Sequence, residues 1–146
     1  MPTIYTIGYT QKPLRQFIGL LQEAGVEAVI DVRLRNTSQL AGFAKRDDLD
    51  FLLREGFGIA YEHVVELAPT AEILDAYKKD HDWPAYERAY RQLLAERDAL
   101  AIGRQLLQRY QRPCLLCAED TADHCHRRLL AEYLAEGIGD LEIVHL

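Results

Sequence analysis

The stretch that decides the fold reads PCLLCAEDTADHCHRRLLAEYLAEG and runs from residue 113 to residue 137. Its first part, PCLLCAE, is short and largely apolar, which is typical of a buried strand. A polar turn over residues 120–123 follows, and apolar side chains then recur at helical spacing from Leu129 to Leu134, up to a closing Gly137. A buried strand that leads through a turn into an amphipathic helix is the repeating unit of an α/β domain.

The same alternation extends along the rest of the chain. Short β-branched or apolar runs predict strands, and amphipathic runs that end at Gly25 and Gly56 predict helices. The expected strands are residues 3–8, 27–33, 57–64, 113–119 and 141–146, and the expected helices are 13–25, 46–56, most of 70–110 and 124–137. Residues 34–45 lack periodicity and are expected to form a loop. We therefore predict one α/β domain over residues 1–146, with a mainly parallel sheet of about five strands and helices on both faces.

Composition and charge narrow the classes of function. The chain has 146 residues, of which 49% are apolar and 27% charged, as expected for a soluble globular domain. Seventeen basic against twenty-three acidic residues give a net charge of −6, which disfavours nonspecific binding to nucleic acid. Three cysteines are too few for a disulfide framework, so we expect reduced thiols. The sequence has no signal-peptide pattern and no membrane-length apolar run, so we expect a cytoplasmic protein without a membrane partner.

Reactive side chains gather where the predicted strands end. In parallel α/β sheets, ligands bind beyond the carboxyl ends of the strands, where loops lead into the following helices. This coincidence predicts a binding or catalytic site at that edge of the sheet. The strand ends carry Gly8, Tyr9 and Thr10, then Asp31 and Arg33, then His63, and finally Cys117 and Glu119.

The two cysteines of the CLLC segment are expected to play different parts. Side chains alternate along a strand, so Cys114 and Cys117 point to opposite faces, which argues against a thioredoxin-like pair. We expect Cys114 to be a small buried apolar residue. Cys117 ends the strand and belongs to the candidate site.

The start of the following helix offers further candidate groups. His126 precedes Leu130 by about one turn and is expected to face inward. Cys125 and Arg127 lie on the flanks of that face, and Arg128 points outward. A helix N-terminus stabilises a thiolate at Cys125 or an anion beside Arg127. The alternatives are a structural hydrogen bond for His126 and an inert thiol for Cys125.

The same segment raises the question of a metal site. Its cysteines and histidines are ligand types, but adjacent Cys125 and His126 on a helix diverge by about 100°, which disfavours their chelating one tetrahedral ion. The spacing matches no standard zinc signature. We therefore expect no cofactor, and a metal ion held by a subset of these residues together with His63 remains an alternative.

Residues at the other strand ends have two interpretations each. Asp31 shares a strand face with Arg33 and is either its ion-pair partner or a general base. His63 is either an acid–base group or a capping histidine. Tyr9 and Thr10 can offer hydroxyls to an anion, and Thr10 can also cap the first helix. We interpret the aromatic residues of the long helical region as core or partner surface: Tyr77, Trp83, Tyr86 and Tyr90.

Four segments resemble the domain of unknown function family 488. They are TIGYT (6–10), VIDVR (29–33), GIAYEH (58–63) and LLCAEDTADHCHRRLLAEYL (115–134), and they follow the order of that family along the whole chain. The resemblance implies an α/β fold and no particular activity. Tyr9 and Thr10 stand where a histidine and a serine are usual, and Leu67-Ala68 where a Leu-Gly pair is common. By matching position, the resemblance implies these candidate site residues: Gly8, Asp31, Arg33, Cys117, Glu119, Cys125, His126 and Arg127.

VIDVR also looks like the second-strand motif of rhodanese-type sulfurtransferases. Those enzymes use a cysteine loop that closes with an arginine around an anion. Neither Cys117 nor Cys125 is followed by an arginine five or six residues later, so the rhodanese signature is absent. Rhodanese-like chemistry is kept only as an alternative.

Together, these patterns predict an enzyme or enzyme-like domain that binds a small anionic or nucleotide-type substrate in a cleft at the carboxyl edge of the sheet. A noncatalytic module that binds nucleic acid or protein through the aromatic helices, and a metal-binding protein, are the alternatives from other classes. The reaction class and the oligomeric state are left open. The candidate catalytic residues are Cys125, His126, Glu119, Asp31 and Cys117, and the candidate anion-binding residues are Arg33, Arg127, Gly8, Tyr9, Thr10 and His63.

Overall fold

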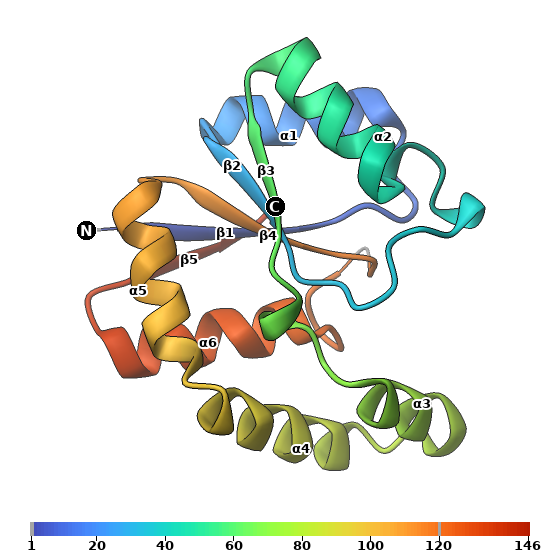
Figure 1. The fold of residues 1–146 in the computed structure, drawn as a ribbon, viewed down its shortest axis with the longest axis vertical. Coiled ribbons are helices and arrows are strands. Elements are labelled where there is room, and N and C mark those ends of the chain that lie inside the picture. Colours follow the sequence, from blue (N-terminus) through green and yellow to red (C-terminus); the bar gives the residue numbers. More distant parts are fainter. Residues whose placement is uncertain (1, 120) are drawn as a thin grey trace.

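The strands of the chain pair into one parallel sheet. A computed structural model describes residues 2–119 and 121–146, so Asp120, which belongs to the predicted turn, lies outside the described residues. Within them, five strands pair in the order β3-β2-β4-β1-β5, and every neighbouring pair is parallel (Figure 1). This confirms the predicted α/β class and its parallel sheet. The strands are β1 (Thr3–Gly8), β2 (Ala28–Asp31), β3 (Ala60–His63), β4 (Pro113–Cys117) and β5 (Glu142–His145).

Helices cover both faces of the sheet, as predicted. Figure 1 shows α1 and α2 on one side of it and α5 and α6 on the other, with α3 and α4 packed outside α6. No helix among the described residues is long and apolar enough to cross a membrane. The α-helices are α1 (Leu14–Ala24), α2 (Arg46–Phe51), α3 (Ala71–Asp80), α4 (Trp83–Glu96), α5 (Ala99–Arg109) and α6 (His126–Ile138).

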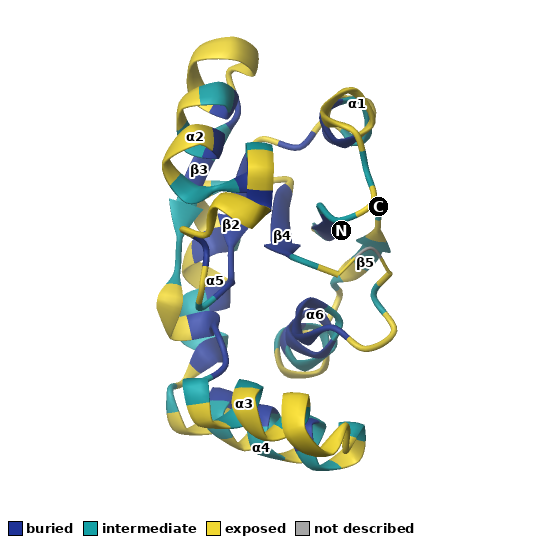
Figure 2. Ribbon diagram, turned by 90° about the vertical axis from the view of Figure 1, so that its right-hand side faces the viewer, coloured by how far each residue is buried: buried dark blue, intermediate teal, exposed yellow. Residues whose placement is uncertain are grey.

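Two hydrophobic cores result, one on each face. The first buries side chains of α1 and α2 against the sheet, and the second buries side chains of α4, α5 and α6. Strand β4 is buried on both faces because Cys114 and Leu116 enter the first core while Leu115 enters the second. Figure 2 shows this contrast between the buried centre and the exposed outer turns of α3 and α4. Cys114 is a free, buried thiol, as expected.

Several element boundaries differ from the predicted ones. The predicted loop contains a 3-10 helix (Gln39–Ala44), and the helix after it ends in a π-helical turn (Leu52–Gly56). A further 3-10 turn (Val65–Leu67) follows β3. Gly137 does not end α6, which continues to Ile138 with Gly139 as its C-cap. A side chain at Gly137 would overlap Leu100 of α5, so this glycine serves helix packing rather than helix termination.

The connections leave the carboxyl edge of the sheet in two directions. Strand β4 lies between β2 and β1, whose chains continue into α2 and α1 on the first face. After β4 the chain instead enters α6 on the opposite face. Loops that diverge from neighbouring strands in this way open a crevice at the strand ends. Cys117, the last residue of β4, lies at that point.

Candidate functional site

A cleft of about 330 Å³ lies at the carboxyl edge of the sheet. It is lined by the loop after β2, by α3, by the end of β4 with the turn that follows it, and by the start of α6. A cleft is thus present at the edge of the sheet where the sequence predicted a site. The predicted site residues that line it are Arg33, Cys117, Glu119, Cys125 and His126.

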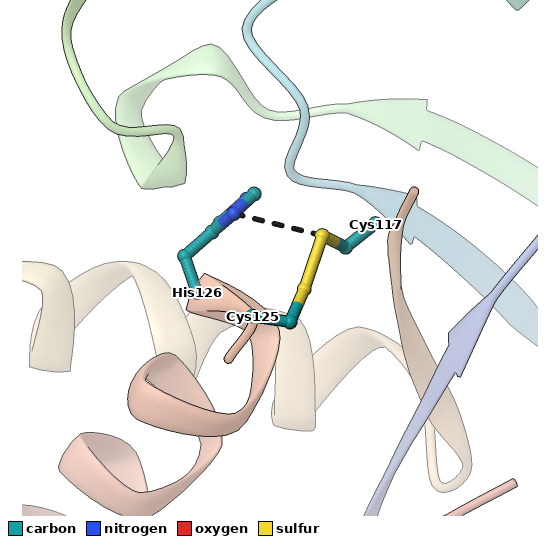
Figure 3. A group of neighbouring side chains, drawn as sticks. All are labelled: Cys117, Cys125 and His126. Atoms are coloured by element: carbon teal, nitrogen blue, oxygen red, sulfur yellow. Dashed lines mark hydrogen bonds between the residues drawn. A yellow bond between two sulfur atoms is a disulfide. The ribbon is translucent and has the colours of Figure 1, made fainter. Parts of the chain in front are cut away.

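Two cysteines in this cleft are linked. Cys117 ends β4, Cys125 is the N-cap residue of α6, and the structure joins them in a disulfide (Figure 3). The prediction of reduced thiols is wrong for this pair in this structure. The sequence argument considered each cysteine on its own element, whereas the turn after β4 brings the start of α6 back to the strand end. Both residues are almost fully buried.

His126 lies beside the disulfide with a fixed orientation. Its Nε2 is 2.7 Å from the carbonyl oxygen of Val32, and because a carbonyl can only accept, Nε2 carries the proton and donates it. The other ring nitrogen, Nδ1, therefore has a free lone pair and lies 3.6 Å from the sulfur of Cys117. Burial, with a smaller contribution from the charge of Arg127, lowers the pKa of His126 to about 4. The imidazole is neutral at neutral pH and acts there as a hydrogen-bond acceptor.

The three side chains form a compact donor set. The sulfur atoms of Cys117 and Cys125 and a ring nitrogen of His126 lie within 4.8 Å of one another. The sequence argument that Cys125 and His126 diverge is wrong, because it assumed that both are helical. Cys125 has an extended backbone, with φ of −135° and ψ of 139°, and precedes the first helical residue. Among the described residues, these three form a group whose geometry could hold a metal ion once the thiols are reduced.

Asp31 belongs to a buried network at the end of β2. It accepts two hydrogen bonds of 2.8 Å from Arg33 and further ones from Asn36 and Tyr61. Burial alone would raise the pKa of Asp31, but the hydrogen bonds and charge of Arg33 outweigh it and hold the pKa below its ordinary value. An ionised, fully buried carboxylate that does not line the cleft fits the ion-pair alternative rather than the general base.

Arg33 connects this network to the cleft. Its Nη2 donates to Asp31 and to the carbonyl of Ala44, while its Nη1 is buried without a hydrogen-bond partner among the described residues. Its guanidinium carbon lies 5.3 Å from the centre of the Tyr9 ring. Arg33 therefore contributes to the lining of the cleft while its guanidinium is held by Asp31 and the backbone. Three exposed cationic or titratable side chains complete the lining on this side: Arg35, Lys78 and His81.

A second set of predicted residues lies behind the cleft wall. Arg127 is buried and donates to the hydroxyl of Thr6 and the carbonyl of Glu119. The hydroxyl of Thr10 donates to the carbonyl of Ala118 at 2.7 Å, and it does not cap α1, whose N-cap is Pro13. These contacts fasten the turn after β4 to the first strand.

Gly8 and His63 also position the backbone around the cleft. A side chain on Gly8 would overlap the carbonyl of Glu119, so only glycine admits this turn so close to β1. His63 Nε2 donates to the carbonyl of Arg33 at 2.8 Å and so holds the loop after β2. Neither residue is among the described residues that line the cleft.

Sequence reasoning missed the contribution of α3 and of Tyr61. Leu74, Tyr77, Lys78 and His81 line the cleft from α3, but no local pattern shows which strand end a helix will cover. Tyr61 donates to Asp31 from the neighbouring strand. The register that pairs Tyr61 with Val29 is seen only in the structure, so the sequence offered no signal for this contact.

The aromatic residues pack mostly against one another. Tyr86 and Tyr90 are buried, and the Tyr90 hydroxyl donates to the carbonyl of Leu67 at 2.6 Å. Trp83 stacks between Tyr86 and His124, with ring centres 4.9 Å apart on each side. This packing fits the interpretation of these rings as core, and it holds His124 at the mouth of the cleft.

Comparison with known proteins yields one match. No curated protein and no solved structure matches the chain. A family model described as "Domain of unknown function DUF488" matches residues 13–134, which include β2, β4 and the start of α6. The TIGYT segment (6–10) lies outside the matched range, so the family match covers less of the chain than the resemblance described above. Because the match spans well over half of the sequence, the chain belongs to the DUF488 family of domains of unknown function.

Proposed function

We propose that this chain is an enzyme-like domain that binds a small anionic or nucleotide-type substrate in the cleft and presents it to the thiols of Cys117 and Cys125. The observation that carries the proposal is the meeting of Arg33 and the Cys117–Cys125–His126 group in the lining of one cleft. A cationic group beside a thiol pair is an arrangement for holding an anion next to a nucleophile.

Charge and size support an anionic ligand. The chain as a whole carries a net charge of −6, yet Arg33, Arg35 and Lys78 line this cleft with Glu119 as the single acidic residue among the described ones. Arg33 and Arg35 also pair with Asp31 and Asp75, and Lys78 is the third cation of the lining. A guanidinium donates to carboxylate or phosphate oxygens in a fixed geometry, which gives orientation as well as attraction. A volume of about 330 Å³ is at the lower end of the range for small-molecule sites.

The two thiols would have distinct roles in the reduced chain. Cys125 is the N-cap residue of α6, where the helix N-terminus favours a thiolate, so it is the candidate nucleophile. The Cys117 thiol would donate to Nδ1 of His126, 3.6 Å away, and is the thiol that pairs with Cys125 in the oxidised chain. Glu119, exposed at the cleft mouth, is the remaining candidate for proton transfer.

A matched pair of lysine variants tests the binding part of this proposal. We would titrate the oxidised chain with a panel of inorganic phosphate, nucleoside monophosphates and nucleoside diphosphates by calorimetry. At least one member should bind, and Lys78→Gln should weaken that binding roughly tenfold, which corresponds to about 1.4 kcal/mol. Lys79 is the exposed neighbour that does not line the cleft, and Lys79→Gln should leave the affinity unchanged. Absence of binding across the panel, or equal losses in both variants, would contradict the proposal.

A further inference from the structure

We propose that the reduced chain binds one zinc ion through Cys117 Sγ, Cys125 Sγ and His126 Nδ1. This site lies in the same cleft as the proposed substrate, but it does not depend on any substrate binding there. The three donors come from two elements whose positions are fixed by the fold, the end of β4 and the start of α6 (Figure 3).

The distances suit a tetrahedral ion. Zinc binds thiolate sulfur at about 2.3 Å and imidazole nitrogen at about 2.0–2.1 Å, so a sulfur and a nitrogen on one tetrahedral zinc are about 3.6 Å apart. Cys117 Sγ and His126 Nδ1 are 3.6 Å apart. Cys125 Sγ completes a set in which all three donors lie within 4.8 Å.

The backbone leaves room for the two sulfur atoms to separate. On one tetrahedral zinc, two sulfurs lie about 3.8 Å apart, so the disulfide must open before the ion enters. The Cα atoms of Cys117 and Cys125 are 7.3 Å apart, which is wider than the range of about 4.4–6.8 Å usual for disulfides. The spacing of these two Cα atoms therefore leaves room between the side chains for an ion once the disulfide is open.

His126 is oriented as metal-binding histidines are. Such residues generally donate the second ring N–H to a backbone carbonyl or a carboxylate, which fixes the ring and leaves the other nitrogen for the metal. His126 donates Nε2–H to the carbonyl of Val32 at 2.7 Å, and Nδ1 is the nitrogen on the side of Cys117. Val32 directly follows β2, so a third element holds the ligand in place.

The donor types select the class of ion, and the cleft gives it an open position. Two thiolates and an imidazole favour zinc over magnesium or calcium, which take oxygen ligands. Three protein ligands leave the fourth tetrahedral position vacant, and all three ligands line the cleft. Water or a donor atom of the substrate would fill that position, which is the arrangement of catalytic rather than structural zinc sites.

The disulfide and the zinc complex exclude one another. A dithiol reductant gives two electrons and two protons to the Cys117–Cys125 bond, which breaks into two thiols while the reductant becomes a disulfide. Zinc then forms two Zn–S bonds and one Zn–N bond, and the two thiol protons pass to solvent. Oxidation of the pair would release the ion.

Cobalt titration of the full chain tests the site. We would reduce the protein with a water-soluble phosphine, remove the phosphine without oxygen, and add Co²⁺ as a spectroscopic probe. One Co²⁺ per chain should bind, with a sulfur-to-cobalt charge-transfer band and the intense visible bands of a tetrahedral site. Zn²⁺ should displace it, and the oxidised chain should show no such bands.

Variants assign the ligands. Cys117→Ser and Cys125→Ser should each abolish the charge-transfer spectrum or change its intensity at least twofold, and His126→Gln should weaken binding at least tenfold. Cys114→Ala is the matched control, because Cys114 lies in the opposite core, and it should bind as the unmodified chain does. Circular dichroism checks that each variant is folded. If His126→Gln does not fold, the two serine variants still test the site.

Three results would overturn the proposal: no binding by the reduced chain, equal binding by the oxidised chain, or an unchanged spectrum in both serine variants. The titration contains no anionic ligand, and the anion-binding test uses the oxidised chain. Failure of the zinc site and failure of the substrate cleft are therefore separate outcomes.

Discussion

Two groups of side chains lie at the same edge of the sheet and differ in how completely their polar atoms are paired. The carboxylate group consists of Asp31, Arg33, Asn36 and Tyr61, and in it the carboxylate of Asp31 accepts from all three other residues. The thiol group consists of Cys117, Cys125 and His126, and in it the Nδ1 lone pair of His126 faces only a sulfur at 3.6 Å. The buried charge of Asp31 is tolerated because its carboxylate is fully paired, although Nη1 of Arg33 has no partner among the described residues. Neutral thiols and imidazole can instead exchange partners.

This difference indicates different functions for the two groups. The carboxylate group holds β2, β3 and the loop after β2 in one arrangement. The thiol group can exist as a disulfide, as two thiols or, in our proposal, as ligands of zinc. In our proposal the carboxylate group supports the cleft and the thiol group is its reactive part, although both groups were candidate catalytic residues from the sequence.

The strongest test of this difference is to remove the buried charge of Asp31. Asp31→Asn leaves the guanidinium of Arg33 buried without its counter-ion, and we expect it to lower the free energy of unfolding by about 3–5 kcal/mol. Asp75→Asn removes the exposed partner of Arg35 and should cost at most about 1 kcal/mol. Urea unfolding of both variants measures the two changes. A cost below that of Asp75→Asn would mean that Asp31 is not a structural residue.

Acid should affect the thiol group before the carboxylate group. The pKa of His126 falls from 6.5 to about 4 on folding, so below pH 6.5 the unfolded chain binds more protons and stability decreases as pH falls. We expect a loss of about 3 kcal/mol between about pH 6.5 and pH 4 from this residue. Asp31 has a folded pKa below 3.8, so its contribution is lost only at lower pH.

Urea unfolding of the oxidised chain as a function of pH measures this loss. His126→Gln should be less stable at neutral pH, but it should lose about 3 kcal/mol less than the unmodified chain over the same pH interval. Parallel curves for the two proteins would show that folding leaves the pKa of His126 unchanged. That outcome would contradict the burial of the imidazole that lowers its pKa here.

A smaller loss of stability is expected from a substitution at Gly8, which lies against the turn that leads to Cys125. Gly8→Ala places a methyl group on the carbonyl of Glu119 and should displace the turn that leads to Cys125, at a cost of about 1–3 kcal/mol. Gly19→Ala in α1 has open space around it and should stabilise the chain by about 0.5–1 kcal/mol. Thermal unfolding measures both. Equal effects would show that the turn adapts to the added methyl group.

The sequence was sufficient for the fold because periodicity reports burial directly. The continuous apolar run of β2 and the helical spacing of Phe17, Ile18 and Leu21 correspond to residues that are buried in the structure. The same reasoning located Cys117, Cys125 and His126 at one edge, since the carboxyl ends of parallel strands meet there. Periodicity does not report backbone angles, and so it placed Cys125 on the helix when its extended conformation turns it toward Cys117.

Contacts between residues far apart in the chain were the other feature that the sequence could not predict. Asp31 had two interpretations because its partner Tyr61 comes from another strand and Asn36 from an irregular loop. The lining of the cleft by α3 depends on how that helix packs against α4, which no local pattern encodes.

The smallest effect is expected for Cys114→Ala, which tests whether Cys114 is a structural residue, unlike the two cysteines of the cleft. Cys114 lies on the same strand as Cys117 but is enclosed in the opposite core, where burial raises the pKa of its thiol and makes it unreactive. Cys114→Ala should cost only about 1 kcal/mol, because it removes one small buried group. A thiol reagent added in denaturant to the oxidised chain should find one thiol, and none in Cys114→Ala. Three thiols in the unmodified chain would mean that Cys117 and Cys125 are not paired. The thiol group would then have no oxidised form, and its contrast with the carboxylate group would rest on the reduced thiols alone.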